Sequence, residues 1–502
     1  MQNAAQRSEA DTSNLVRRTE AGPVKGVRSG GICRFFSIPY AAPPVGENRF
    51  KEPQPAIPWP GERDATQPGP SAPHRIKDFP AIDVVPLVGS GSEGGEDYLT
   101  LNIWAPDSAE GRPVMVFIHG GGFVVGSKDA PVSDGTEFAR SGVVCVAINY
   151  RLGIEGWLPI PGAPTNLGMR DMIFALEWVQ RNIAEFGGDP ANVTVFGESA
   201  GAMAIADLIA SPLAEGLFRR AIIESGHGGM VREIPVAQRL VRKLAKILKV
   251  TPDVDGFRKV DFDSAWKAME KVSKPWSIDL RDADGHEPVF GISRFIPVHG
   301  DDVLPQKPIE ALKNGAGKEV DVLIGTNSEE MNLYFVPTKV RAKAPGLLLR
   351  WLLGKAHPKA RHALEAYGWG KGKKAGHVFV DAMHDLVFRW PARRFAEEHQ
   401  GRTHFYDFDW KSPACDGQLG ACHGLELPFV FKTLPTATGA KGFAGETPPQ
   451  ELADHIHDLW VQFATDGALP WPEFDRESRQ VQLLGSNTTI SEPVMPAAAF
   501  LP

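Results

Sequence analysis

Short apolar runs separated by polar or glycine-rich stretches recur along the 502-residue chain. Runs rich in Val, Ile and Phe are typical of strands buried on both faces of a sheet. Between two of these runs, residues 169–186 place apolar side chains at helical spacing. The pattern predicts strands over Leu99–Trp104, Val114–Ile118, Val143–Tyr150, Val193–Phe196, Ala221–Glu224, Val320–Ile324 and Thr403–Phe408.

Strands that alternate with helices predict an α/β fold, in which helices cover both faces of a mostly parallel sheet. Residues 1–21 are polar and are expected to be flexible, and residues 67–97 are rich in Pro, Gly and Ser, which predicts a surface loop. We find no internal repeat and no linker that separates two domains. The whole chain, 1–502, is therefore expected to form one enlarged domain with insertions.

Composition and charge exclude some classes of function. The net charge of −7 and the pI of about 6.1 argue against a nucleic-acid binder. We find no apolar run of the roughly 20 residues that a membrane span needs, and the polar start lacks a signal-peptide core, so a cytoplasmic location is expected. The four cysteines lack metal-ligand spacing and are predicted to be free thiols, namely Cys33, Cys145, Cys415 and Cys422.

A Gly-x-Ser-x-Gly motif at Gly197–Gly201 follows one predicted strand and precedes a helix-forming stretch. A serine at such a turn is held at a helix N-terminus, where backbone N–H groups can stabilise an oxyanion. The context predicts that Ser199 is a nucleophile.

Three glycines follow the strand Val114–Ile118, in His119–Phe123. Consecutive glycines leave backbone N–H groups bare, which suits an oxyanion loop. A flexible turn is the alternative, and the nearby serine motif favours the oxyanion loop.

A serine nucleophile needs a base and an acid, which follow it in the order acid, then histidine. His423 lies in a loop of small residues after the strand Thr403–Phe408 and is the predicted base. The other late histidines, within 357–404 and at 455 and 457, are interpreted as surface residues. For the acid, Glu329 and Glu330 both follow the strand Val320–Ile324, and chemistry alone does not choose between them.

The chain resembles the type-B carboxylesterases, which include p-nitrobenzyl esterases, liver carboxylesterases and cholinesterases. The matching stretches occur in the same order along the chain as in the family. The resemblance implies an α/β-hydrolase fold. The matching stretches are Phe35–Gly46, Gly95–Ile103, His119–Phe123, Asn149–Arg151, Asn166–Gly168, Ala175–Val179, Phe186–Pro190, the serine motif, Glu224–Gly226 and His423 with Glu426–Phe429.

By this resemblance Glu330 is the acid of the triad. The oxyanion donors it implies are the N–H groups of Gly121, Gly122 and Ala200, and the supporting residues are Ser225 and Glu198. It implies no metal and no cofactor. Met331 departs from the family, which places glycine after the acid. Ala72 and Tyr98 replace the cysteines that form a disulfide in secreted relatives.

The resulting interpretation is a serine hydrolase that cleaves small-molecule carboxylic esters through an acyl-enzyme. Two alternatives stay open at this point: a natural amide or carbamate substrate, and an inactive binding module of the same fold.

One charged segment remains to be explained. Residues 339–374 hold ten Lys and Arg against one acid, Glu365. The segment is either a solvated surface or a basic rim that attracts esters bearing a carboxylate.

Overall fold

A central sheet organises the part of the chain that the computed structural model describes, residues 15–76, 79, 81–91, 95–288 and 292–501. Within these residues the sheet has 11 strands, in the order β16-β15-β14-β13-β10-β9-β7-β8-β6-β4-β3. Their bounds are Val27–Ser29 (β3), Ile32–Pro39 (β4), Thr100–Pro106 (β6), Arg112–Ile118 (β7), Val144–Ile148 (β8), Gly188–Glu198 (β9), Arg220–Glu224 (β10), Asp321–Asn327 (β13), Thr403–Phe408 (β14), Gln480–Leu483 (β15) and Thr488–Ser491 (β16).

The middle of the sheet is parallel, from β8 through β7, β9, β10, β13 and β14 to β15. The register places Glu198 beside Glu224, and Glu224 beside Gly325. The carboxyl ends of β9, β10 and β13 therefore meet at one edge of the sheet, where open α/β sheets place functional groups.

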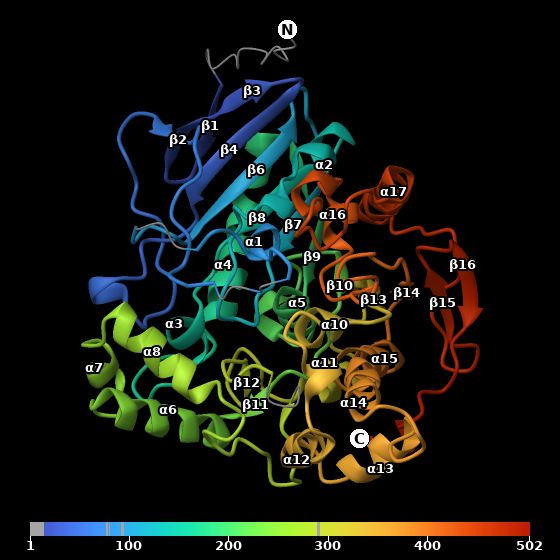
Figure 1. Ribbon diagram of the computed structural model, residues 1–502. Coiled ribbons are helices and arrows are strands. Elements are labelled where there is room, and N and C mark those ends of the chain that lie inside the picture. The colour runs from blue at the N-terminus through green and yellow to red at the C-terminus, as the bar shows by residue number, and fades with distance from the viewer. Residues whose placement is uncertain (1–14, 77–78, 80, 92–94, 289–291, 502) are drawn as a thin grey trace, which may run out of the picture.

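The edges of the sheet are antiparallel, at β3, β4 and β6 on one side and at β16 on the other. These two edges lie on opposite sides of the molecule (Figure 1). Two small sheets complete the strands. Their members are Val16–Thr19 (β1), Gly22–Lys25 (β2) and Arg63–Asp64 (β5), and Arg232–Glu233 (β11) and Val298–His299 (β12).

Helices cover the sheet and build a large helical region beyond the carboxyl ends of its strands (Figure 1). Their bounds are Val85–Val88 (α1), Thr136–Arg140 (α2), Gly153–Trp157 (α3), Leu167–Asn182 (α4), Ala200–Ala210 (α5), Ile234–Leu248 (α6), Val254–Phe257 (α7), Phe262–Val272 (α8), Pro308–Lys313 (α9), Asn332–Phe335 (α10), Val340–Lys343 (α11), Gly346–Ala356 (α12), Ala360–Ala366 (α13), Ala375–His384 (α14), Trp390–Glu398 (α15), Leu427–Val430 (α16) and Gln450–Asp466 (α17). A π-helical turn, Asp385–Arg389, joins α14 to α15.

All seven predicted strands are present, with ends that differ by a few residues. The predicted helix over 169–186 is α4 followed by a 3-10 turn, Ile183–Phe186. Part of the segment expected to be flexible, Val16–Thr19, pairs with β2. The predicted surface loop contains the short helix α1.

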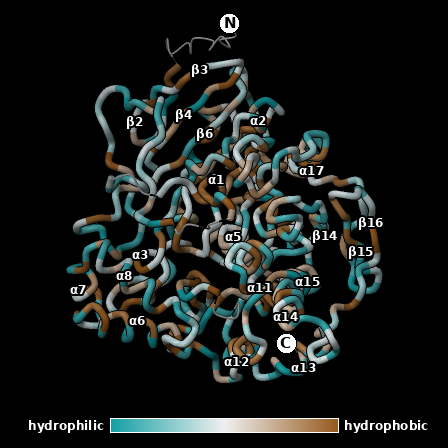
Figure 2. Tube along the Cα trace, viewed as in Figure 1, coloured by the Kyte–Doolittle hydropathy of each residue, from teal (hydrophilic) through white to brown (hydrophobic). Residues whose placement is uncertain are grey.

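Burial follows the patterns of the sequence. Every residue of β8, β10 and β14 is buried, as expected for strands covered on both faces. Helices α6 and α8 bury one face each, and both alternate between apolar and polar colours in Figure 2. Among the helices of the described residues, none has the length and apolar character that crossing a bilayer requires.

Candidate active site

Ser199 lies at the turn between β9 and α5, with φ of 55° and ψ of −122°. Its backbone N–H donates to the carbonyl of Glu224 on the neighbouring strand, at 2.9 Å. This bond holds the unusual conformation, and the hydroxyl is thereby fixed at the first turn of α5.

The two glycines of the motif are needed because the end of β7 passes close to the turn. A Cβ at Gly197 would lie 2.4 Å from the carbonyl oxygen of Ile118, and one at Gly201 would lie 2.0 Å from the same atom. Any side chain at either position would push the serine turn away from the glycine loop that follows Ile118.

A chain of short contacts joins Ser199 to His423 and Glu330. Ser199 Oγ lies 2.8 Å from Nε2 of His423, and Nδ1 of the same ring lies 2.6 Å from Glu330 Oε2. All three side chains are buried. These three residues were predicted from separate segments of the sequence, and in the structure their side chains are in contact in series.

The two candidate acids, Glu329 and Glu330, have different surroundings. Glu330 is fully buried, and its second oxygen accepts a hydrogen bond from the backbone N–H of Asn327 at 2.8 Å. Glu329 instead accepts from the N–H of Ala421 and lies 3.7 Å from Lys411, a largely exposed residue. Only Glu330 therefore contacts the histidine.

Met331, the departure from the family pattern, is buried, and its N–H donates to Nδ1 of His384 at 2.9 Å. Burial lowers the pKa of His384 to about 3, so this ring is neutral and can accept. The π-helical turn that follows His384 carries Phe388, whose ring centre lies 4.6 Å from that of His423. One helical segment thus supports both the acid and the base, a role that no local signal in the sequence indicates.

Glu198, the neighbour of Ser199, places its carboxylate 3.0 Å from Nε2 of His423. Burial by itself lowers the pKa of His423, but the nearby carboxylates of Glu198 and Glu330 outweigh this effect and raise it well above 6.5. The site therefore favours an imidazolium, the form that His423 takes after it accepts a proton.

A second layer of acids lies beneath the histidine. Glu426 accepts hydrogen bonds from Asn327 and from Ser225 Oγ, the latter at 3.5 Å. Burial raises the pKa of Glu426 to about 8, aided by the charges of Glu198 and Glu330. Ser225 therefore hydrogen-bonds to Glu426. Glu426 was named only as the start of a stretch that matches the family and was given no role, although its place three residues after His423 was a usable signal.

Burial also raises the pKa of Glu224 well above its usual value, and Trp460 donates to this carboxyl group at 3.2 Å. Burial therefore favours the uncharged form of Glu224. The same effect at Glu426 works against the build-up of negative charge in the buried site.

The glycine loop is held from two sides. Tyr150 donates its hydroxyl to the carbonyl of His119 at 2.8 Å, and Ser293 donates to the carbonyl of Gly122 at 2.9 Å. Gly121, Gly122 and Ala200 line the same cavity as Ser199. The predicted oxyanion donors are thus gathered around the nucleophile.

The active-site cavity has a volume of about 330 Å³. Most of its other lining residues are apolar, and they come from loops, α1, α5, α8, α10 and the π-helical turn. They include Phe79, Val84, Leu87, Val124, Met203, Met230, Trp266, Met269, Leu333, Tyr334 and Phe388. Apart from His423, its charged lining residues are Arg75, Glu198 and Glu270, and Arg75 is paired with Asp263 at 2.5 Å.

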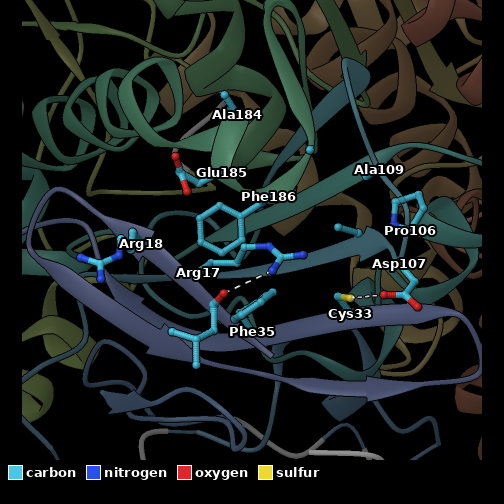
Figure 3. Close-up of a pocket in the computed structure, with 13 residues that line it drawn as sticks. Arg17, Arg18, Cys33, Phe35, Pro106, Asp107, Ala109, Ala184, Glu185 and Phe186 are labelled. Carbon is cyan, nitrogen blue, oxygen red and sulfur yellow. Dashed lines mark hydrogen bonds between the residues drawn. The ribbon is translucent and has the colours of Figure 1, made fainter. Parts of the chain in front are cut away.

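A larger hollow, of about 420 Å³, lies near the N-terminal strands (Figure 3). It holds Cys33, whose thiol points toward Asp107 at 3.4 Å, and Arg17, which donates to the carbonyl of Val16. Burial raises the pKa of Cys33, so the thiol is a poor nucleophile. Volume alone would therefore have pointed to a region without a paired nucleophile and base.

The interpretation of the late histidines as surface residues was largely wrong. His357, His384, His399, His404 and His457 are buried. Charged neighbours in the sequence misled the prediction, because on a helix or strand adjacent residues face different directions. The prediction of four free thiols is confirmed for Cys33, Cys145, Cys415 and Cys422.

Comparison with known proteins agrees with this geometry. A sequence model described as the carboxylesterase family matches residues 13–496. The para-nitrobenzyl esterase of Bacillus subtilis (strain 168) is 35% identical over 487 residues, which cover 94% of this chain and 95% of that protein. The phenmedipham hydrolase of Pseudarthrobacter oxydans is 33% identical over 492 residues, covering 94% and 95%.

A solved structure of a PNB esterase superposes with a TM-score of 0.82 at 32% identity and covers 97% of this chain and 99% of its own. The fold is the α/β-hydrolase fold, and the enzyme class is carboxylic ester hydrolase. On its sequence and its structure alike, the chain belongs to the carboxylesterase family.

Proposed function

We propose that Ser199, His423 and Glu330 are the catalytic triad of this ester hydrolase, and that its substrates are neutral, mainly apolar carboxylic esters. The observation that carries the proposal is the unbroken chain of contacts from Ser199 Oγ through both ring nitrogens of His423 to Glu330. A histidine held by an acid on one nitrogen can take the serine proton on the other.

In the acylation step Ser199 Oγ bonds to the ester carbonyl carbon while its proton moves to Nε2 of His423. The carbonyl oxygen becomes an oxyanion that accepts from the N–H groups of Gly121, Gly122 and Ala200. Each such donor is worth on the order of 3 kcal/mol in the transition state. The carbon–oxygen bond then breaks, and the leaving alcohol takes the proton from His423.

Deacylation repeats this sequence with water. A water molecule gives a proton to His423 and its oxygen bonds to the acyl carbon, after which Ser199 Oγ leaves and regains the proton. The acid product departs with the hydroxyl oxygen of that water. Glu198 and Glu330 stabilise the imidazolium formed in both steps, because their carboxylates lie 3.0 Å and 2.6 Å from the ring nitrogens.

The charges that line the cavity support neutral substrates. Apart from His423, they are one arginine, already paired, and two carboxylates. Among the described lining residues, none belongs to the basic segment 339–374. We therefore set aside the preference for carboxylate-bearing esters that a basic rim would have given.

An inactive binding module is not favoured, because nucleophile, base and acid are all in contact. Amides and carbamates are also not favoured over esters, given the esterase relatives. We further propose a cytoplasmic location, which suits a chain whose four cysteines are all thiols.

The test uses p-nitrophenyl butyrate, a neutral ester. The wild-type enzyme should release a burst of nitrophenol equal to the enzyme concentration when deacylation is slower than acylation, and Ser199→Ala should lower kcat by on the order of a million-fold. Ser225→Ala is the matched control and should retain most of the activity. A Ser199→Ala enzyme of near-native activity would refute the proposal.

A further inference from the structure

A second cavity, of about 370 Å³, adjoins the active-site cavity beside α8. Three residues line both cavities: Val124, Trp266 and Met269. Trp266 and Met269 are three residues apart on α8 and therefore lie on one face of that helix. We call these three side chains, which border both cavities, the partition.

Met269 gives the partition one flexible side chain. Methionine is unbranched and has three rotatable side-chain bonds, so it can change its shape without moving the backbone. The Met269 methyl group lies over Gly153, where a Cβ would be only 2.6 Å from it, and Gly153 has φ of +54°. Glycine at this position leaves room for the methyl group beside the second cavity.

The second cavity has both apolar and charged lining residues. The apolar residues include Val45, Leu152, Ile154, Phe262 and Ala265. The charged lining residues are Arg49, Glu96, Glu155 and Asp261.

Arg49 is fully engaged, because it pairs with Glu155 at 2.6 Å and donates to the carbonyls of Arg258 and Val260. The guanidinium is therefore not available to an anion, and the remaining carboxylates of Glu96 and Asp261 repel one. The cavity suits a neutral hydrocarbon chain.

We propose that the second cavity binds the distal end of long, neutral ester substrates, and that such chains displace Met269 and Trp266 of the partition. The proposal rests on the function proposed above for the active-site cavity. It adds that the enzyme accepts esters with long acyl or alkyl chains. Each methylene that leaves water for this cavity should improve binding about fourfold. Esters too short to reach the partition should not respond to changes beyond it.

The experiment measures kcat/KM for p-nitrophenyl acyl esters and for alkyl acetates, each from two to ten carbons. The readout in each series is the ratio of long-chain to short-chain kcat/KM. Ala265 lines the second cavity only, so Ala265→Leu should fill that cavity and lower the ratio about tenfold in at least one series, through KM. Met269→Ala should open the partition and raise the ratio several-fold.

Two controls accompany these variants. Lys267→Ala changes an exposed residue of the same helix and should leave the ratio unchanged. Met230→Ala removes the same side-chain atoms from the active-site cavity without reaching the second one, and should raise the ratio less than Met269→Ala.

The outcomes decide between the claims. An Ala265→Leu ratio within twofold of wild type in both series would overturn binding in the second cavity, even if Met269→Ala raised it. Equal effects of Met230→Ala and Met269→Ala would overturn the role of Met269 as a barrier between the two cavities. If Ala265→Leu fails to fold, the comparison of these two variants tests the proposal in its place. Failure of the proposed function looks different, because Ser199→Ala would then keep near-native activity on esters of every length.

Discussion

The floor and the walls of the active-site cavity are built in different ways. The floor consists of Ser199, His423 and the glycine loop, with Glu330 buried behind the histidine, and each is held by hydrogen bonds to a strand end or a buried side chain. The walls consist of apolar side chains from α8, α10 and the π-helical turn, held mainly by packing. Changes in the floor should therefore alter the chemical step, and changes in the walls should alter which esters are accepted.

The largest effect that the comparison predicts is at the acid. Glu330→Gln should lower kcat by about 10⁴-fold, because an amide that donates to His423 favours the wrong tautomer. Steady-state kinetics with p-nitrophenyl butyrate measure this loss. Glu329→Gln, a change of the same type one residue away, should reduce kcat less than tenfold. The reverse ranking would show that the acid is misassigned.

Variants of His384 test whether a residue behind the triad also affects the chemical step. His384→Leu removes the acceptor of the Met331 N–H and frees the loop that carries Glu330, so kcat should fall by about 100-fold while KM changes little. His384→Asn offers an oxygen at the same place and should restore most of kcat. His399→Leu, at a buried histidine bonded to Thr403 and Gly317, is the control for stability alone. Equal kcat losses in all three variants would contradict the proposal that His384 positions the loop that carries Glu330.

Glu198 should affect the pH dependence more than the maximal rate. His423 must be neutral to act as the base, and the carboxylate of Glu198 favours its protonated form by raising its pKa. Glu198→Gln removes that charge, so the acidic limb of the kcat/KM profile should move to lower pH. A limb that stayed in place or moved to higher pH would contradict this electrostatic role.

The smallest effect is expected at the basic segment. Lys371, Lys373 and Lys374 are exposed, and the triple change to Gln should alter KM less than twofold, for a neutral ester and for its carboxylate-bearing analogue alike. Measurements at low and high salt complete this test, because steering by charge weakens with ionic strength. A salt-dependent rise in KM for the charged ester alone would return the segment to the substrate path.

The difference between the floor and the walls of the cavity also explains which features could be predicted from the sequence. The seven strands and the serine turn were predictable because their signals are local, a run of apolar residues or a glycine spacing. His423 was found from its place after a strand, and Glu330 was separated from Glu329 only through family resemblance. Burial and the contact with Asn327 now explain that choice physically.

Contacts between distant segments were not predictable. His384 lies 53 residues from Met331 in the chain, and Glu426 lies 99 residues from Asn327. The apolar walls, including Trp266 and Met269, were missed for a related reason. An apolar residue on an amphipathic helix has the same sequence signal whether it faces a core or a cavity.

The central claim is that Ser199 is the nucleophile, activated by His423. The most direct measurement is peptide mapping by mass spectrometry after reaction with diisopropyl fluorophosphate, which phosphorylates activated serines. We expect one adduct per chain, on Ser199, formed in step with the loss of esterase activity and suppressed by His423→Ala. An adduct on Ser225 or another serine, or full inactivation with Ser199 unmodified, would contradict the account.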